Sequence, residues 1–305
     1  HHALSLESWN GLVHGSYGRP ISDTSHHHKV VNPAHGETPY GGGVIVPFNA
    51  EKSLLYNLIT GNVEDHTLAM PYNRTRLPQS QIDAIKTWIN NGARSFNGEV
   101  PYQSSQNKIY VCAQGSDEVY VVDPDRKAVS AIIDVDFLKS ANDQPHNIQI
   151  KNGFIYVTLI STGRFLKYDI NTLALVGFVD GLVSPGMIMM SPDGKKAYVS
   201  KSSTAQGDYN TIYVIDTESM TRNADISLTP GLPHAIALSS YGTTLYAANL
   251  TKDRISILNT VTGEYIEDIV LSPGSVSVHE PMHMYISPDD KYLYVNCRKS
   301  SKMLV

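Results

Sequence analysis

The chain has 305 residues, of which 41% are hydrophobic and 17% charged, and its formal net charge is −5. This length predicts one large domain or two ordinary ones. The acidic balance and the lack of a basic run argue against nucleic acid as a partner. The sequence has no stretch of about 18 apolar residues, so it predicts no membrane-spanning helix.

Residues 1–98 carry two predicted helices and no internal repeat. Residues 53–59 indicate a short helix that ends at Thr60-Gly61. Pro78 opens a second helix over residues 79–91, and one face of it carries the apolar residues Ile82, Ile85, Trp88 and Ile89. Asn91-Gly92 supplies its stop. We interpret the polar residues 99–106 as a linker to the rest of the chain.

From Asn107 onward a unit with several strands recurs. It begins with a proline and a short apolar strand, continues through a tight turn, and reaches a strand built around a tyrosine. The prolines are Pro145, Pro185, Pro233 and Pro281, and the tyrosines are Tyr156, Tyr198, Tyr246 and Tyr294. The prolines are 40, 48 and 48 residues apart, and a period of 40 to 50 residues is typical of a β-propeller.

The units of residues 107–305 are not all complete. We expect three strands in the first unit, three full units, and a fifth that ends after its second strand, about four and a half blades in all. The third strand of each unit ends in a residue that we interpret as a turn former bonded to its own backbone. These residues are Asp123, Asp169, Asp216 and Asn259.

Two other patterns predict no chemistry. Cys112 and Cys297 fall on opposite faces of equivalent strands, four repeats apart, so we expect two independent thiols rather than a disulfide. His279 to His283 spells H-E-x-x-H, which binds zinc only on a helix. Pro281 interrupts this segment and a strand follows, so we interpret the match as chance.

The repeats resemble the YVTN/YncE-like family of seven-bladed propellers over about residues 107–305. The segments that carry the resemblance are Ser191-Pro192-Asp193-Gly194-Lys195-Lys196-Ala197-Tyr198-Val199 and Ile212-Tyr213-Val214-Ile215-Asp216-Thr217. The resemblance implies the architecture and leaves the function open, because the family includes lactonase-like enzymes, copper enzymes and binding scaffolds. We expect a C-terminally truncated propeller.

Residues 1–98 resemble a c-type cytochrome domain that is fused ahead of such propellers in bacterial secreted proteins. The matching segments are residues 4–12, residues 44–56, Met70-Pro71 and residues 77–93. In that family a C-x-x-C-H motif precedes the segment that matches Leu4, and this sequence contains no such motif. We therefore interpret residues 1–98 as an N-terminally truncated, mostly α, cytochrome c-like domain.

This resemblance implies haem c in the full-length protein. Met70 would be the axial ligand of the haem iron, and Ile85 and Trp88 would pack against the porphyrin. The alternative for Met70 is a methionine that fills the core. Histidines are also dense before residue 70, and they would offer another axial ligand, a surface metal site or only a polar loop. They are His1, His2, His14, His26, His27, His28, His35 and His66.

A separate set of histidines belongs to the repeats. His146, His234 and His283 lie at or near the start of an inner strand, and in a propeller such positions converge at one mouth of the central channel. A ligand site or a copper site would be geometrically feasible there. The alternative is a capping role in which the imidazole bonds a loop carbonyl. Gly186 takes the equivalent place in one repeat and interrupts the set.

Our leading hypothesis is therefore haem-dependent electron transfer by a periplasmic or extracellular bacterial protein, with the propeller as the docking or ligand-binding module for a redox partner or a small molecule. The first alternative is a non-catalytic binding scaffold. The second is a propeller enzyme, lactonase-like or copper-dependent, that would use His146, His234 and His283. The residues favour an electron-transfer or binding protein over a hydrolase.

Overall fold

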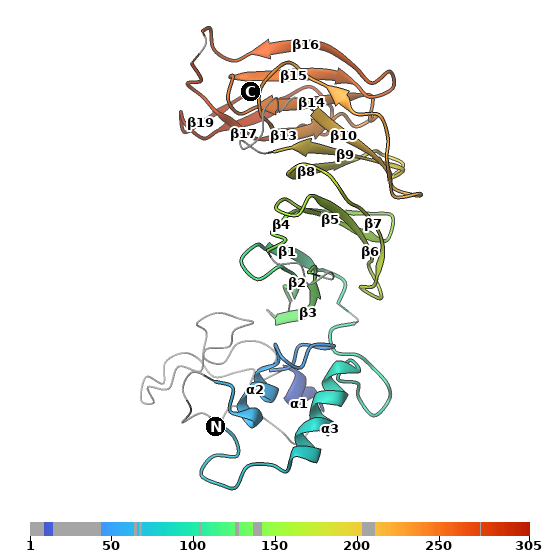
Figure 1. Ribbon diagram of the computed structural model, residues 1–305, viewed down its shortest axis with the longest axis vertical. Helices are drawn as coiled ribbons and strands as arrows, with labels where there is room; N and C mark the ends of the chain where they lie inside the picture. The colour runs from blue at the N-terminus through green and yellow to red at the C-terminus, as the bar shows by residue number, and fades with distance from the viewer. Residues whose placement is uncertain are drawn as a thin grey trace. The chain divides into compact units, whose positions relative to one another are not determined.

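The computed structural model describes residues 9–14, 44–63, 66, 69–103, 105–125, 128–136, 142–202, 211–274 and 276–305. Contacts divide the chain into two units (Figure 1). Unit 1 comprises His1–Val111 with Glu118–Asp134, and unit 2 comprises Cys112–Asp117 with Val135–Val305. No helix in the described ranges is long and apolar enough to cross a membrane.

Unit 1 contains the helices α1 (Trp9–His14), α2 (Leu54–Thr60) and α3 (Gln79–Asn90). The two helices predicted from residues 53–59 and 79–91 are thereby confirmed, each within one residue of its expected ends. Gly61 ends α2 in the left-handed region at φ 74°, and its N–H donates to the Leu58 carbonyl. Glycine adopts this conformation without the steric cost that a Cβ would add.

An apolar cluster forms the core between α2 and α3. Its buried members are Ile45, Ala50, Leu55, Ile59, Ile82, Ile89 and Ala93. Ile82 and Ile89 lie two helical turns apart on one face of α3, as the heptad spacing requires. The Trp9 indole of α1 donates to the Ala93 carbonyl at 2.7 Å, which ties α1 to the segment that follows α3.

The remainder of the described chain is mainly β and forms five small antiparallel sheets (Figure 1). Sheet 1 contains β1 (Ile109–Ala113), β2 (Glu118–Asp123) and β3 (Ala128–Asp134). Sheet 2 contains β4 (Pro145–Lys151), β5 (Phe154–Leu159), β6 (Arg164–Asp169) and β7 (Leu175–Val179). Sheet 3 contains β8 (Pro185–Met190), β9 (Lys196–Lys201), β10 (Thr211–Asp216), β11 (Thr221–Arg222) and β12 (Ile226–Ser227). Sheet 4 contains β13 (Pro233–Leu238), β14 (Thr244–Asn249), β15 (Arg254–Asn259) and β16 (Glu264–Val270), and sheet 5 contains β17 (Pro281–Ile286), β18 (Leu293–Cys297) and β19 (Lys302–Leu304).

The repeat that the sequence predicted sets the boundaries of these sheets. Each proline head opens the first strand of a sheet, and the pairing register shifts directly after it in β4, β8, β13 and β17. A proline has no N–H for the ladder, so the first residue of a strand is a place where a sheet tolerates it. The sequence placed the end of the fifth unit after its second strand, whereas sheet 5 also contains the short third strand β19.

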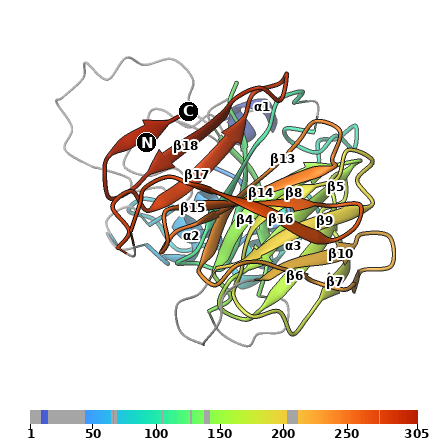
Figure 2. The ribbon, with the colours of Figure 1, turned by 90° about the horizontal axis from the view of Figure 1, so that it is seen from above.

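Sheets 2 to 5 pack face to face in chain order and share apolar cores, which gives unit 2 a propeller-like arrangement (Figure 1). Seen from above, the strands of sheets 2, 3 and 4 overlap (Figure 2). The core between sheets 3 and 4, for example, joins Tyr198 and Ile212 to Ile236 and Leu245. The inner strands meet along this stack, because β8 contacts both β4 and β13, and β13 contacts β17.

Three smaller predictions are also confirmed. Asp169, Asp216 and Asn259 each accept N–H groups two and three residues further along the chain, as turn formers do. Cys112 and Cys297 are free thiols. Pro281 opens β17, so the H-E-x-x-H segment is not helical.

Candidate functional site

The structure brings together the three histidines that the repeats predicted. The ring centroids of His146 and His234 are 6.1 Å apart, and those of His234 and His283 are 5.9 Å apart. Both pairs meet edge to face, at interplanar angles of 85° and 90°. We call these residues the imidazole array. They come from β4, β13 and β17, so three different sheets supply one ring each.

Gly186 lies on the strand between those that carry His146 and His234. It takes the equivalent place in β8, which contacts both β4 and β13. The sequence suggested that Gly186 interrupts the set. In the structure the glycine adds no side chain at this place, and a Cβ there would meet the Ser202 hydroxyl at 2.1 Å.

Hydrogen bonds fix the state of two rings in the imidazole array. Gln114 Nε2 donates to His146 Nδ1 at 2.9 Å, so the neutral ring of His146 carries its proton on Nε2. His234 Nδ1 donates to the Met282 carbonyl at 3.0 Å, so its Nε2 presents a lone pair. The second bond matches the predicted capping alternative, an imidazole bonded to a carbonyl.

Burial shapes the charge of the imidazole array. Desolvation lowers the pKa of His146, and the nearby His283 lowers it further. Desolvation also lowers the pKa of His234, against the hydrogen bond to Met282, which raises it. Both rings are therefore uncharged at neutral pH. Among the described residues, however, no group of three or more His, Cys, Asp or Glu side chains is arranged to hold a metal ion.

The residues predicted to hold a haem also lie together, in unit 1. Met70, Ile85 and Trp88 are all half-buried and all pack against the apolar cluster between α2 and α3. The Met70 N–H donates to the Leu58 carbonyl at 2.9 Å, which fixes the loop to the end of α2. The Trp88 indole donates to the Arg94 carbonyl at 2.9 Å. Of the dense early histidines, only His66 has a described side chain, and it is exposed.

The donor set of unit 1 fits part of a haem c site. Met70 has a soft thioether, and its side chain packs against the same apolar cluster as the partly exposed side chains of Ile85 and Trp88. The two cysteines of this chain do not supply the thioether links of haem c, because they lie in β1 and β18 and neither belongs to a C-x-x-C-H motif. Burial raises the pKa of Cys112 to about 11, which keeps that thiol protonated and unreactive.

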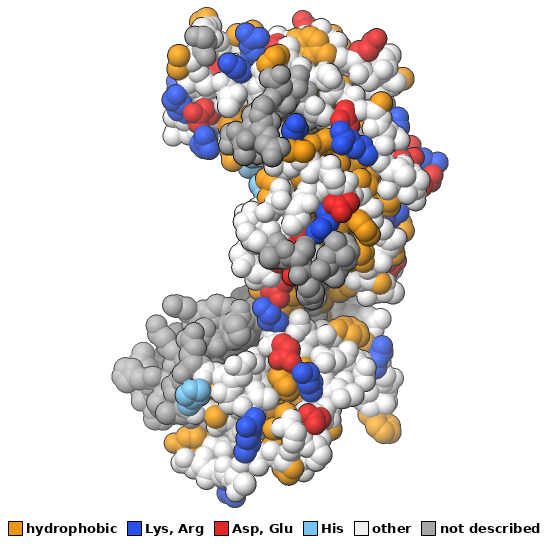
Figure 3. Space-filling view, in the orientation of Figure 1, with side chains coloured by type: hydrophobic (Ala, Val, Ile, Leu, Met, Phe, Trp, Pro, Cys, Tyr) orange, Lys and Arg blue, Asp and Glu red, His pale blue; other side chains and the backbone are white. Residues whose placement is uncertain are grey.

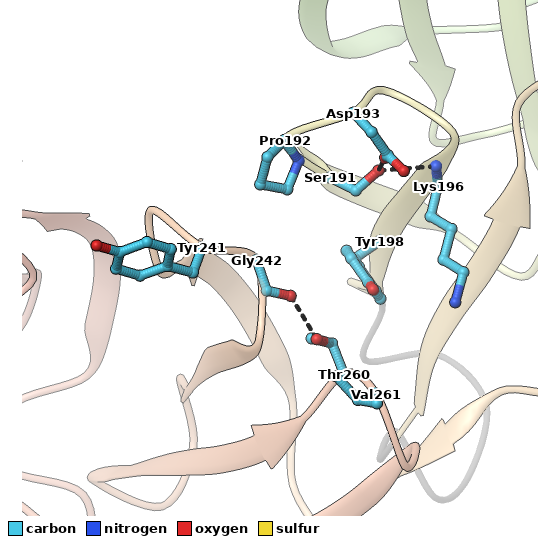
Figure 4. Close-up of a pocket in the computed structure, with 9 residues that line it drawn as sticks. All are labelled: Ser191, Pro192, Asp193, Lys196, Tyr198, Tyr241, Gly242, Thr260 and Val261. Atoms are coloured by element: carbon cyan, nitrogen blue, oxygen red, sulfur yellow. Dashed lines mark hydrogen bonds between the residues drawn. The ribbon is translucent and has the colours of Figure 1, made fainter.

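A surface hollow of about 360 Å³ lies between sheets 3 and 4 (Figure 4). We call it the junction hollow. It is lined by Ser191, Pro192, Asp193, Lys196, Tyr198, Tyr241, Gly242, Thr260 and Val261. Several of these residues belong to the repeat segments of the sequence, and none of them was predicted to form a site.

Asp253 is a buried carboxylate for which the sequence predicted no role. It lies at the turn between β14 and β15, is 1% exposed, and accepts hydrogen bonds from the hydroxyls of Ser272 and Ser277 and from the N–H groups of residues 278 to 280. Asp117, at the corresponding turn after β1, accepts the Gln144 N–H at 2.8 Å just before β4. Both carboxylates hold the chain where it crosses to the next inner strand.

On the face drawn in Figure 3, basic and acidic side chains are interspersed and do not form separate patches. Ion pairs join several of the described basic and acidic side chains, for example Arg298 with Glu280 at 2.8 Å and Arg254 with Asp268 at 3.3 Å.

No protein family and no curated protein matches the chain in comparisons of sequence. Among solved structures the chain is similar to hydrazine synthase of Kuenenia stuttgartiensis. The TM-score is 0.50 and the identity 19%, and the match covers 64% of this chain and 71% of that chain. At this identity the likeness describes the fold, which is propeller-like and mainly β.

Proposed function

We propose that this chain serves haem-dependent electron transfer outside the bacterial cytoplasm, with unit 1 as a cytochrome c-like domain and unit 2 as a docking or ligand-binding module. The observation that supports the proposal is the gathering of Met70, Ile85 and Trp88 around one apolar cluster. Helix α3 carries two of them one turn apart, so one helix face would cover the cofactor.

In this proposal the haem iron would supply one-electron redox chemistry without bond rearrangement. Met70 would offer its sulfur as axial ligand from a loop held to α2 by the hydrogen bond between its N–H and the Leu58 carbonyl. Ile85 and Trp88 would exclude water from the porphyrin edge. The Trp88 indole would stay in place through its bond to the Arg94 carbonyl. A thioether ligand and a dry surround both raise the reduction potential.

The test uses the natural full-length protein, including whatever sequence precedes His1, produced in a bacterium that attaches haem c. We expect a Soret absorption band, and we expect Met70→Ala to lower the reduction potential because the thioether is lost. Met189→Ala is the matched control. It changes a methionine that is also half-buried but lies in unit 2, so the reduction potential should stay unchanged. A purified protein without a Soret band would refute the proposal and favour the binding scaffold.

The second candidate is a ligand-binding or catalytic role for the imidazole array, and the ring contacts between His146, His234 and His283 favour it. Copper is the metal that the resemblance suggests for this place. The metal form of this candidate predicts that the wild-type protein retains Cu²⁺ after dialysis and that the triple variant His146→Ala, His234→Ala, His283→Ala loses it. His66→Ala removes an exposed histidine of unit 1 and serves as the control. Equal copper content in the wild type and the triple variant would contradict the metal form of this candidate.

A further inference from the structure

The junction hollow lies where one repeat differs from its neighbour. At the preceding junction, between sheets 2 and 3, the same space is closed. The Lys167 ammonium donates to the Thr217 carbonyl at 2.8 Å and lies 4.1 Å from the centre of the Phe154 ring. Asn152 also reaches across and donates to the Asp193 carbonyl at 2.8 Å.

We call the Lys167 ammonium and the Phe154 ring, which together fill this space, the plug. The register of the strands identifies the residues that stand in their places between sheets 3 and 4. Tyr156 pairs with Lys167 in sheet 2, and its equivalent Tyr198 pairs with Val214 in sheet 3. Val214 therefore takes the place of Lys167, and its apolar side chain is buried in the core between sheets 3 and 4. The residue two before Tyr156 is Phe154, whereas the residue two before Tyr198 is Lys196. Both halves of the plug are thus absent between sheets 3 and 4.

The floor of the junction hollow is held rigidly. Ser191 Oγ donates to Asp193 Oδ1 at 2.6 Å and accepts the Lys196 N–H at 2.9 Å. Thr260 Oγ1 donates to the Gly242 carbonyl (Figure 4). Gly242 packs so tightly on Pro192 that a Cβ at Gly242 would lie 2.4 Å from the proline ring.

The groups that face into the junction hollow are of mixed character. Lys196 offers an ammonium donor and Asp193 offers a carboxylate acceptor, so the two charges cancel. The Ser191 hydroxyl and the Lys195 N–H lower the pKa of Asp193, which keeps the carboxylate ionised at neutral pH. At the rim Tyr241 is 85% exposed, and it presents its ring on a turn that Gly242 fixes in the left-handed region.

We propose that the junction hollow binds a neutral, hydroxyl-rich ligand, namely a sugar unit of a glycan. Vicinal hydroxyls can donate to a carboxylate and accept from an ammonium at once, which uses both Asp193 and Lys196. A singly charged ligand would be attracted by one of these groups and repelled by the other. The exposed ring of Tyr241 supplies an apolar face for the C–H side of a pyranose. A hollow of about 360 Å³ lies within the usual range for small-molecule sites.

Saturation-transfer NMR and calorimetry with cellobiose, maltose and N,N′-diacetylchitobiose test the proposal on the whole chain. We expect at least one disaccharide to bind, and we expect Lys196→Gln and Tyr241→Ala each to weaken binding about tenfold, the usual effect of one lost charged hydrogen bond or aromatic contact. The matched controls are Lys302→Gln and Tyr292→Ala, which alter an exposed lysine and an exposed tyrosine outside the junction hollow and should leave the affinity unchanged.

A closing variant provides an independent readout. Lys196→Phe places an aromatic ring where Phe154 stands in the preceding junction, so binding should be lost while the thermal unfolding midpoint is retained, because Lys196 is exposed. If no disaccharide binds the wild type, or if Lys196→Gln and Tyr241→Ala bind as the wild type does, the proposal is overturned. Retention of binding in a folded closing variant would overturn it as well. None of these outcomes depends on haem, so the proposed function is tested separately.

Discussion

At the scale of single residues, Asp253 is the buried carboxylate whose pKa the structure lowers most clearly. Burial by itself would raise the pKa of this carboxyl group, but the hydrogen bonds from Ser277, the Val278 N–H, Ser272 and the Glu280 N–H outweigh it, and the pKa lies far below its usual value. The ionised carboxylate therefore organises the crossing into β17. The carboxylate and the groups that donate to it are distant in sequence, so no local sequence pattern predicts the arrangement.

The pKa of Asp253 predicts how acid affects stability. Because the folded pKa lies below the unfolded value of about 3.9, the stabilisation is fully present above that value and is lost as the pH falls below it. Asp253→Asn should lower the free energy of unfolding by about 3 kcal/mol at neutral pH. It should also flatten the acid limb of the stability curve.

Urea unfolding at several pH values measures both effects. Glu218→Gln is the control, because Glu218 is exposed and its only recorded ion pair in the described chain, with Lys195, spans 3.7 Å. Such a surface pair contributes less than about 1 kcal/mol. An Asp253→Asn protein as stable as the wild type at neutral pH would show that the carboxylate does not hold this crossing.

At the scale of elements, turns with positive φ decide how the strands connect. Gly153 joins β4 to β5 at φ 79°, and Gly163 joins β5 to β6 at φ 75°. Their surroundings differ sharply. A Cβ at Gly153 meets open space, whereas one at Gly163 would lie 2.0 Å from the Leu182 carbonyl oxygen.

This pair of glycines separates conformational strain from steric clash. Gly153→Ala should cost about 1 kcal/mol of unfolding free energy, the strain of a left-handed alanine alone. Gly163→Ala should cost about 3 kcal/mol or more, because backbone must also move. Chemical denaturation of the two variants gives the comparison, and equal losses would mean that the segment at Leu182 adjusts freely.

At the scale of the whole molecule, the sheets repeat but their junctions do not. The cores between sheets 2 and 3 and between sheets 3 and 4 share tyrosine and isoleucine positions. The ends of these junctions differ. Lys167 fills the space between sheets 2 and 3, whereas the junction hollow lies at the corresponding place between sheets 3 and 4. The proposed sugar site follows from this break in the repeat. Electron transfer, by contrast, would depend on unit 1, where Met70 and Trp88 share one apolar cluster.

The sequence by itself determined the repeat, the two helices and the turn formers, because these follow from local spacing. A proline every 40 to 48 residues and the apolar face of α3 are visible without tertiary contacts. It also predicted that His146, His234 and His283 converge, since equivalent strands of a repeat meet at one place.

Only the tertiary structure decided what lies between repeats. That Gly186 packs against Ser202, that Asp253 holds a crossing about 25 residues away in the chain, and that Val214 is buried between sheets 3 and 4 all depend on tertiary packing. The physical reason is that secondary structure is set by neighbours within a few residues. Cavities, buried carboxylates and ring contacts are instead set by residues that the fold brings together from distant parts of the chain.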